Sequence, residues 1–464
     1  MTTSPAYRTQ NPATGEVLAT YDFATDDQIA EALAASAQAF GEFAARPIEE
    51  RAAIVARIGD LFTERADELA TTITTEMGKP IAEAHEEVEF CRDIFAYYAA
   101  EGPGLAADRV LTEADGARAV IQRRALGPLL GIMPWNYPYY QVARFVAPNL
   151  MLGNTIILKH AEICPASALA VQRLFHDAGV PAGVYQNLFA THEQVSTIIA
   201  DPRIQGISLT GSERAGAAVA EQAGRHLKKV VLELGGSDPY VVLSSADPRA
   251  AAREALAVRM ENTGQACNSN KRMIVMADVY EEFVDELRTQ VAALTPADPA
   301  TGAEGTYGPL SSPSAAALLL EQVRDAVDHG ATLHVGGTHL DRPGNYVAPA
   351  VLTDIPDGAR AYREELFGPV AAVYKVTSEE QALRLANDSP YGLSGTVFAT
   401  EPGRAEAFAE QMQVGMAGAN APAPETADMP FGGVKRSGYG RELGPLGMDE
   451  FVNKRLFYVE SAQS

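Results

Sequence analysis

Two side chains of this protein, a thiol and a carboxylate, could carry covalent chemistry. Cys267 lies in residues 264–272, Gly-Gln-Ala-Cys-Asn-Ser-Asn-Lys-Arg, and Glu233 lies upstream in residues 231–236, Val-Leu-Glu-Leu-Gly-Gly. A cysteine thiolate can act as a covalent nucleophile, and a glutamate can be the base that later activates water. A lone cysteine is more often a buried, inert packing residue. The nucleophile hypothesis therefore needs support from the rest of the chain.

A second group of candidates lies more than a hundred residues before the cysteine. Asn136 is bracketed by Pro134 and Pro138, and Arg144 follows it by eight residues. Flanking prolines stiffen a loop, which suits a side-chain amide that stabilises an oxyanion. An arginine on an otherwise apolar helix face would suit a substrate carboxylate. The alternatives are a turn with an aromatic plug at Trp135 and an ordinary surface arginine.

Two further segments have features of a nucleotide site. Lys159 and Glu162 lie at and just past the end of an apolar strand, residues 155–159. A carboxylate there can accept hydrogen bonds from ribose hydroxyls and would repel a 2′-phosphate. Gly211 and Ser212 form a turn between a strand and a helix, whose backbone N–H groups could bind pyrophosphate. A solvated Lys/Glu pair and a routine N-cap are the alternatives.

Composition limits the class of function. The chain has 464 residues, with 60 acidic against 37 basic side chains and a formal net charge of −23. This balance argues against nucleic acid or an anionic membrane as a partner. Three scattered cysteines do not make a disulfide framework or a zinc site, so we expect no metal. Without an apolar leader or a membrane-spanning run, a cytoplasmic location is expected, where a free thiol persists.

The order of elements predicts the fold class. Residues 26–101 have helical periodicity, and from residue 154 to residue 234 short apolar strands alternate with amphipathic helices. Such alternation predicts a parallel, doubly wound Rossmann-like sheet that binds ligands beyond the carboxyl ends of its strands. A second α/β region follows from about residue 235 to residue 430. Residues 451–460 alternate like an edge strand without a local partner, so we expect them to pair with another subunit.

Together and in this order, these segments resemble the aldehyde dehydrogenase superfamily. The resemblance extends from residues 11–16, Asn-Pro-Ala-Thr-Gly-Glu, to residues 430–438, Pro-Phe-Gly-Gly-Val-Lys-Arg-Ser-Gly. It includes the 34-residue separation of Glu233 and Cys267 (267 − 233 = 34). Within the superfamily, the Lys-His-Ala of residues 159–161 is similar to that of bacterial succinate-semialdehyde dehydrogenases.

The resemblance implies a role for each candidate. Cys267 would attack the aldehyde, Asn136 and the Cys267 N–H would hold the oxyanion, and Glu233 would activate the water that hydrolyses a thioester. A base at position 233 favours a free acid over transfer to coenzyme A. Positions that match cofactor contacts are Trp135, Lys159, Glu162, Gly211, Ser212, Glu365 and Phe367.

The resemblance also bears on cofactor and substrate. A glutamate at position 162 goes with NAD, whereas the similar succinate-semialdehyde dehydrogenases often have a small residue there and use NADP; we therefore favour NAD and keep NADP open. Arg144 matches an arginine that binds a distal carboxylate. Glu261 stands where some of these enzymes have a second arginine, and Asn268 is polar where an apolar group or a thiol is common. Both departures bear on which aldehyde is bound.

We therefore expect an NAD(P)-dependent, hydrolytic aldehyde dehydrogenase with succinate semialdehyde as the leading substrate. A broader enzyme for ω-oxo acids or amino-aldehydes and a catalytically silent binding protein are the alternatives. The resemblance implies a cofactor-binding domain (residues 1–116 and 134–234), an α/β catalytic domain (235–435) and small β oligomerisation segments (117–133 and 436–464). A homodimer or homotetramer is expected.

Overall fold

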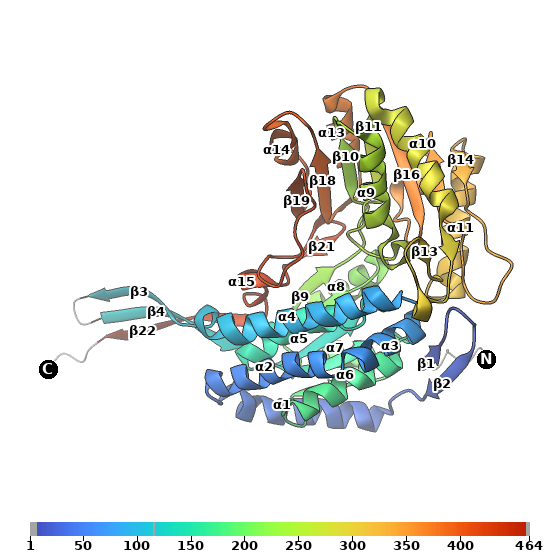
Figure 1. Cartoon of the computed structure of the whole chain (residues 1–464). Coiled ribbons are helices and arrows are strands. Elements are labelled where there is room, and N and C mark those ends of the chain that lie inside the picture. The colour runs from blue at the N-terminus through green and yellow to red at the C-terminus, as the bar shows by residue number, and fades with distance from the viewer. Residues whose placement is uncertain (1–6, 115–116, 461–464) are drawn as a thin grey trace.

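The computed structural model describes residues 7–114 and 117–460. Three sheets organise the chain (Figure 1): a six-stranded sheet, a seven-stranded sheet and a three-stranded sheet that extends away from the other two. Both ends of the expected domain ranges, residues 1–6 and 461–464, lie outside the described residues. In the described part of the chain, no helix is long and apolar enough to cross a membrane.

The six-stranded sheet has the strand order β21-β9-β8-β5-β6-β7. Five neighbouring strands pair in parallel, and only the short β21 is antiparallel. Every residue of β6 and β8 is buried, as expected where helices cover both faces of a parallel sheet. The doubly wound Rossmann-like prediction is confirmed. The strands are β5 (Pro128–Met133), β6 (Thr155–His160), β7 (Tyr185–Asn187), β8 (Gly206–Thr210), β9 (Lys229–Glu233) and β21 (Gly438–Tyr439).

Helices pack on both faces of this sheet, as two separate apolar clusters show. One cluster joins the sheet to α1 (Asp26–Ala44), α7 (His192–Ala200) and α8 (Glu213–Arg225). On the other face lie α2 (Ile48–Glu64), α3 (Ala66–Met77), α4 (Ile81–Leu105), α5 (Tyr140–Leu152) and α6 (Pro165–Asp177). The predicted helical stretch over residues 26–101 is therefore four helices, α1 to α4.

The seven-stranded sheet forms the centre of the second α/β region. Its order is β14-β15-β16-β11-β10-β18-β19, parallel except for the β14–β15 pair. The strands are β10 (Pro239–Val242), β11 (Arg272–Met276), β14 (Thr332–Val335), β15 (Ala350–Thr353), β16 (Val370–Val376), β18 (Ser394–Phe398) and β19 (Met416–Ala419). Two clusters pack on it, with helices α9 (Pro248–Met260), α10 (Ala277–Ala293), α11 (Pro313–Asp328), α13 (Glu379–Asn387) and α14 (Arg404–Ala409).

The three-stranded sheet contains only parts of the two segments that we expect to take part in oligomerisation. It consists of β3 (Arg109–Ala114), β4 (Ala117–Ala125) and β22 (Val452–Glu460), in the order β22-β4-β3. The terminal strand therefore has a partner, β4, within its own chain. Residues 128–133, which we grouped with this element, form β5 inside the cofactor sheet, and β21 pairs there with β9.

Burial explains why the strand at residues 128–133 belongs to the cofactor sheet. In β4 buried residues are interspersed with partly and fully exposed ones, whereas five of the six residues of β5 are buried. A nearly continuous apolar strand is stable only when both faces are covered.

The remaining elements are short. They are β1 (Tyr7–Gln10), β2 (Val17–Tyr21), β12 (Thr295–Pro296), β13 (Thr306–Tyr307), β17 (Tyr391–Gly392), β20 (Val434–Lys435), α12 (Arg360–Arg363), α15 (Gly444–Gly447) and the 3-10 turns η1 (Glu261–Gly264) and η2 (Pro299–Thr301).

Candidate active site

The carboxyl ends of four parallel strands bring the predicted site residues to one edge of the six-stranded sheet. Strands β5, β6, β8 and β9 end at Met133, His160, Thr210 and Glu233. Because these strands are parallel, the segments that follow them lie at the same edge. That edge carries Asn136, Lys159, Glu162, Gly211, Ser212 and Glu233.

The turn before the nucleophile has a strained backbone. Asn262, Thr263 and Gly264 have φ values of 50°, 54° and 77°, in the left-handed region. Such conformations cost free energy and persist where surrounding contacts enforce them. The N–H of Ser311 donates to Gln265 Oε1 (3.0 Å), and a Cβ at Gly264 would overlap the carbonyl oxygen of Gly368. Contacts with residues outside the turn therefore fix its conformation, and Cys267 follows shortly after it.

Asn136 is bound directly to this turn. Its Nδ2 donates to the carbonyl oxygen of Gln265 (3.1 Å), and its own carbonyl accepts a bond from Asn262 Nδ2 (2.8 Å). Gln265 is two residues from Cys267, so the structure brings the predicted amide donor and the predicted nucleophile together. An amide nitrogen has two N–H donors. The second donor can serve an oxyanion.

The thiol of Cys267 is half-buried in an environment of mixed charge. Burial raises the pKa of Cys267 to about 12. The cations Arg144 and Lys271 act in the opposite direction and lower this pKa, whereas Glu365 and Glu425 raise it further. The thiolate is the nucleophilic form. Its population therefore depends on the balance of these four charged groups.

Glu233 ends strand β9 with a buried side chain. Neither of its carboxylate oxygens has a hydrogen-bond partner among the residues that the structure describes. A Cβ at Gly432 would lie 2.6 Å from Glu233 Oε1, so the carboxylate packs directly against a glycine. Burial raises the pKa of Glu233 well above its usual range, although the nearby Arg144 opposes the shift. A raised pKa makes a carboxylate a stronger base when it is ionised.

Arg144 is completely buried in helix α5. Every residue of α5 is buried, and the Arg144 side chain is 0% exposed. Its guanidinium forms an ion pair with Glu442 and lies over the rings of Phe431 and Tyr140, 4.4 and 4.9 Å from their centroids. Burial alone lowers the pKa of Arg144, but the combined effect of Glu442 and, to a smaller extent, Tyr140, Glu233 and Cys267 outweighs it, so the net shift is upward.

The surface-arginine alternative is therefore wrong. The charge of Arg144 is paired with an internal carboxylate, that of Glu442. Glu87 of α4 holds this helix in place by accepting the backbone N–H groups of Tyr139 (2.8 Å) and Tyr140 (3.1 Å). Backbone N–H groups in the first turn of a helix need such external acceptors.

Glu261 and Asn268 line a cavity of about 220 Å³ beside the nucleophile turn. The hydroxyl of Tyr137 donates to Glu261 Oε1 (2.6 Å), and Asn268 Nδ2 contacts the carboxylate of Glu425. Burial among protein atoms, followed by the charge of Glu261, raises the pKa of Glu425 to about 7. Sequence reasoning missed Glu425, which lies far along the chain from the residues it contacts.

The predicted ribose and pyrophosphate positions lie beyond β6 and β8. Lys159 Nζ pairs with Glu162 Oε1 at 2.9 Å. Ser212 caps α8 by accepting the N–H of Ala215 (3.3 Å), and the N–H of Gly211 donates to the carbonyl of Glu233 (3.0 Å). A carboxylate suits ribose hydroxyls, and a helix N-terminus suits a phosphate. The Gly211 N–H is already bonded within the protein, so the Glu162 carboxylate and the N-terminus of α8 are the features that suit a dinucleotide.

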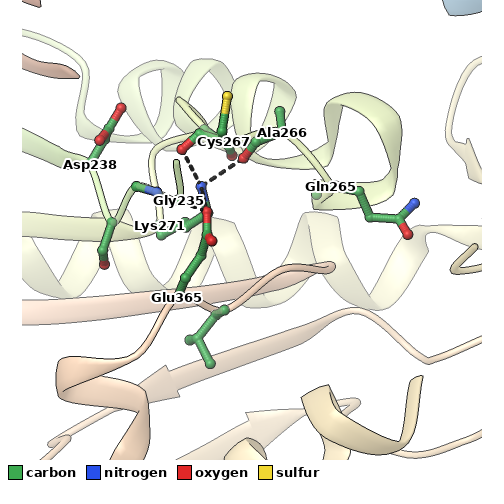
Figure 2. Close-up of polar contacts among 12 residues, drawn as sticks. Gly235, Asp238, Gln265, Ala266, Cys267, Lys271 and Glu365 are labelled. Atoms are coloured by element: carbon green, nitrogen blue, oxygen red, sulfur yellow. Dashed lines mark hydrogen bonds and ion pairs between the residues drawn. The ribbon is translucent and has the colours of Figure 1, made fainter. Parts of the chain in front are cut away.

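Trp135, Phe367 and Glu365 are the remaining residues predicted to contact the cofactor. The rings of Trp135 and Phe367 meet edge to face, with centroids 5.6 Å apart and planes at 84°. Glu365 lies next to Lys271, whose ammonium group also donates to the carbonyl oxygens of Ala266 and Cys267 (Figure 2). An aromatic pair beside a carboxylate suits a planar ring attached to a ribose. Lys271, like Glu425 and Glu442, was not among the predicted site residues.

Comparisons with known proteins agree with this geometry. Residues 1–456 match the model of the aldehyde dehydrogenase family. The chain belongs to the aldehyde dehydrogenase family. It is 51% identical to the NADP(+) succinate-semialdehyde dehydrogenase of Deinococcus radiodurans over 450 residues, 97% of this chain and 94% of that protein. It is 40% identical to NADP(+) succinate-semialdehyde dehydrogenase 1 of Mycobacterium tuberculosis, over 97% of this chain and 99% of the other.

A solved aldehyde dehydrogenase shows the same fold. The succinic semialdehyde dehydrogenase of Streptococcus pyogenes, crystallised with NADP+, superposes with a TM-score of 0.95 at 41% identity, covering 98% of this chain and 100% of the other. The predicted resemblance and fold are confirmed. The protein is thus an NAD(P)-dependent enzyme that oxidises an aldehyde to an acid.

Proposed function

We propose that this aldehyde dehydrogenase converts succinate semialdehyde to succinate by covalent catalysis at Cys267, followed by hydrolysis. The contact of Asn136 with the turn that carries Cys267 is the observation that supports it most directly. Addition of a nucleophile to a carbonyl group requires a fixed hydrogen-bond donor for the oxyanion that forms. The Asn136 amide, which is bonded to the turn that carries Cys267, can be that donor.

The steps follow from the chemistry of these residues. The Cys267 thiolate adds to the aldehyde carbon, and the Asn136 amide and the Cys267 N–H stabilise the resulting oxyanion. A nicotinamide nucleotide, held by Lys159, Glu162 and the N-terminus of α8, would supply the oxidant as an acceptor of the hydride from that carbon. The thioester left on Cys267 is then hydrolysed by a water that Glu233 deprotonates, because a carboxylate with a raised pKa is a stronger base once it is ionised.

Two observations bear on the substrate in opposite directions. The named activities of the relatives and the positive charge of Arg144 near Cys267 support an aldehyde with a distal carboxylate. The cavity beside the turn is lined by three carboxylates, Asp238, Glu261 and Glu425, and these favour a cationic or neutral tail. An enzyme for amino-aldehydes or longer ω-oxo acids is therefore the second candidate.

For the cofactor we propose a preference for NAD. Glu162 follows β6 at the edge where the nucleotide ribose is expected, and its carboxylate would repel a 2′-phosphate. Lys159 neutralises part of this charge, and the names of the relatives point to NADP. Glu162→Ser isolates the contribution of this carboxylate, since the change removes the charge and keeps a hydroxyl acceptor.

We also propose a homo-oligomer formed through the three-stranded sheet. Leu456, Phe457, Tyr458, Val110 and Leu111 are exposed on β22 and β3. Exposed apolar side chains beside unpaired strand edges favour association with a second copy. All three cysteines are free, which supports a reducing compartment such as the cytoplasm.

A steady-state panel tests the substrate and cofactor proposals together. Reduced cofactor is followed with succinate semialdehyde, pentanal and 4-aminobutanal, each with NAD and with NADP. We expect succinate semialdehyde with NAD to have the highest kcat/KM, and Glu162→Ser to improve kcat/KM with NADP about tenfold or more. A higher kcat/KM for pentanal or 4-aminobutanal would refute the substrate proposal. Preference of the wild type for NADP would refute the cofactor proposal.

A further inference from the structure

Lys271 is a fully buried cation four residues after the nucleophile. Its Nζ donates to the carbonyl oxygens of Ala266 (2.6 Å) and Cys267 (2.7 Å), and lies 3.1 Å from Glu365 Oε1 (Figure 2). The side chain is 0% exposed. A lysine ammonium has three N–H donors, and these three acceptors account for all of them. The position of Nζ is therefore determined completely by the nucleophile turn and Glu365.

Glu365 connects this cation to the segment that follows Glu233. Its Oε1 also accepts the backbone N–H of Gly236 (3.0 Å). The backbone of Gly235 and Gly236 lies close to both segments. A Cβ at Gly235 would overlap the Glu365 carboxylate, and a Cβ at Gly236 would overlap the Cys267 carbonyl oxygen. Lys271 and Glu365 thus lie where the segments carrying Cys267 and Glu233 meet.

The carbonyl oxygen and the sulfur of Cys267 point in different directions. In Figure 2 the carbonyl oxygen of Cys267 points towards Lys271, whereas the sulfur points away from it. Lys271 therefore leaves the thiol free for a substrate and acts on the backbone that carries it. A buried ion pair that loses one partner leaves an uncompensated charge. The contact is consequently a fixed part of the site.

We propose that Lys271 is a positioning residue for the reaction, which holds the backbone of the Cys267 turn and couples it to the carboxylate of Glu365. The proposal rests on the proposed role of Cys267 as nucleophile. Lys271 acts through Cys267 and Glu365 and does not contact the substrate. Its charge also favours the thiolate, whereas the charge of Glu365 opposes it.

The pH dependence of thiol alkylation tests this role in the protein without added nucleotide. The charged groups that act on the thiol are Arg144, Lys271, Glu365 and Glu425, so one charge is changed at a time. The rate of iodoacetamide labelling is measured from pH 6 to pH 10 in the wild type, Lys271→Met, Lys271→Gln and Glu365→Gln. Mass spectrometry assigns the label, with buried Cys91 and Cys164 as internal references.

We expect opposite shifts from the two partners. Lys271→Met should lower the labelling rate at pH 8 about threefold to tenfold, and Glu365→Gln should raise it, because one change removes a cation near the thiol and the other removes an anion. Lys271→Gln keeps hydrogen-bond donors without the charge, so its labelling should fall while its Tm stays above that of Lys271→Met.

Unchanged labelling profiles in both Lys271 variants would overturn the proposal, as would shifts of the same sign in Lys271→Met and Glu365→Gln. A general loss of structure moves all variants in one direction, and the opposite sign at Glu365 excludes that explanation. A different measurement tests the proposed role of Cys267 as the nucleophile. If Cys267→Ser still oxidises aldehydes, Cys267 is not the nucleophile, whatever the Lys271 variants show.

Discussion

At the scale of single residues, the two reacting groups share an unusual property. Burial raises the pKa of both the Cys267 thiol and the Glu233 carboxyl, which favours the protonated form of each group. A thiol must lose its proton to attack, and a carboxyl must lose its proton to act as a base. The same physical cause therefore limits both halves of the reaction.

The sign of the pH dependence follows directly. Groups with raised pKa values lie in the inactive, protonated form below those values, so activity should increase as the pH rises. We expect kcat/KM to increase between pH 6.5 and pH 9 by up to about tenfold per pH unit, and kcat to increase as well where hydrolysis limits turnover. Steady-state rates at fixed ionic strength provide the measurement. A maximum of kcat/KM below pH 7 would contradict the raised pKa values of Cys267 and Glu233.

Much of the residue-level site was predictable, and the misses have a common cause. Cys267 and Asn136 were recognised by residue type and local context, and the structure brings them together. Glu425 and Glu442 were missed because each acts on a partner, Asn268 or Arg144, from a distant part of the chain. Lys271 is close to Cys267 in the sequence, but its contacts with the carbonyl oxygens of Ala266 and Cys267 and with Glu365 exist only in the folded chain.

At the scale of elements, the left-handed turn η1 is the feature on which the nucleophile depends. Gly264 has a positive φ, and its Cα lies against the carbonyl of Gly368. Periodicity predicted helices and strands well, because it reflects burial of one face or two. It did not predict this turn, since its conformation is imposed by contacts from residues 308–311 and 368.

Gly264→Ala tests the importance of this turn. The added methyl group meets both an unfavourable φ and a backbone oxygen, so we expect a loss of about 2–5 kcal/mol in the free energy of unfolding, together with a large loss of kcat. Gly104→Ala in α4 is the matched control, because its Cβ would meet no atom within 4 Å. Urea unfolding compares the two, and equal stability of both variants would refute the argument.

At the scale of the whole molecule, the three-stranded sheet stands apart from the body that contains the site (Figure 1). The sequence indicated an edge strand at the C-terminal end but did not identify its partner. That partner, β4, is more than three hundred residues away in the chain. Pairing over such a distance leaves no local signal, and the exposed apolar side chains of the sheet become evident only once the strands are placed.

A charge on this sheet should weaken self-association. Leu456 on β22 is 63% exposed, and a lysine there would have to be desolvated in an interface between copies. We expect Leu456→Lys to give a smaller species in size-exclusion chromatography with light scattering. Leu318→Lys, on helix α11 and 48% exposed, should leave the size unchanged. An unaltered mass for Leu456→Lys would exclude this strand from the interface.

We propose that Cys267 attacks the aldehyde and that Glu233 acts later, in hydrolysis of the thioester. Rapid-mixing kinetics of Glu233→Gln tests these separate roles most directly. With succinate semialdehyde and nucleotide, we expect a burst of reduced cofactor close to one equivalent per active site, followed by turnover at least about a hundredfold slower than in the wild type. Cys267→Ala should show neither phase. Wild-type turnover in Glu233→Gln, or the absence of its burst, would contradict the claim that Glu233 acts on the thioester after the hydride has left.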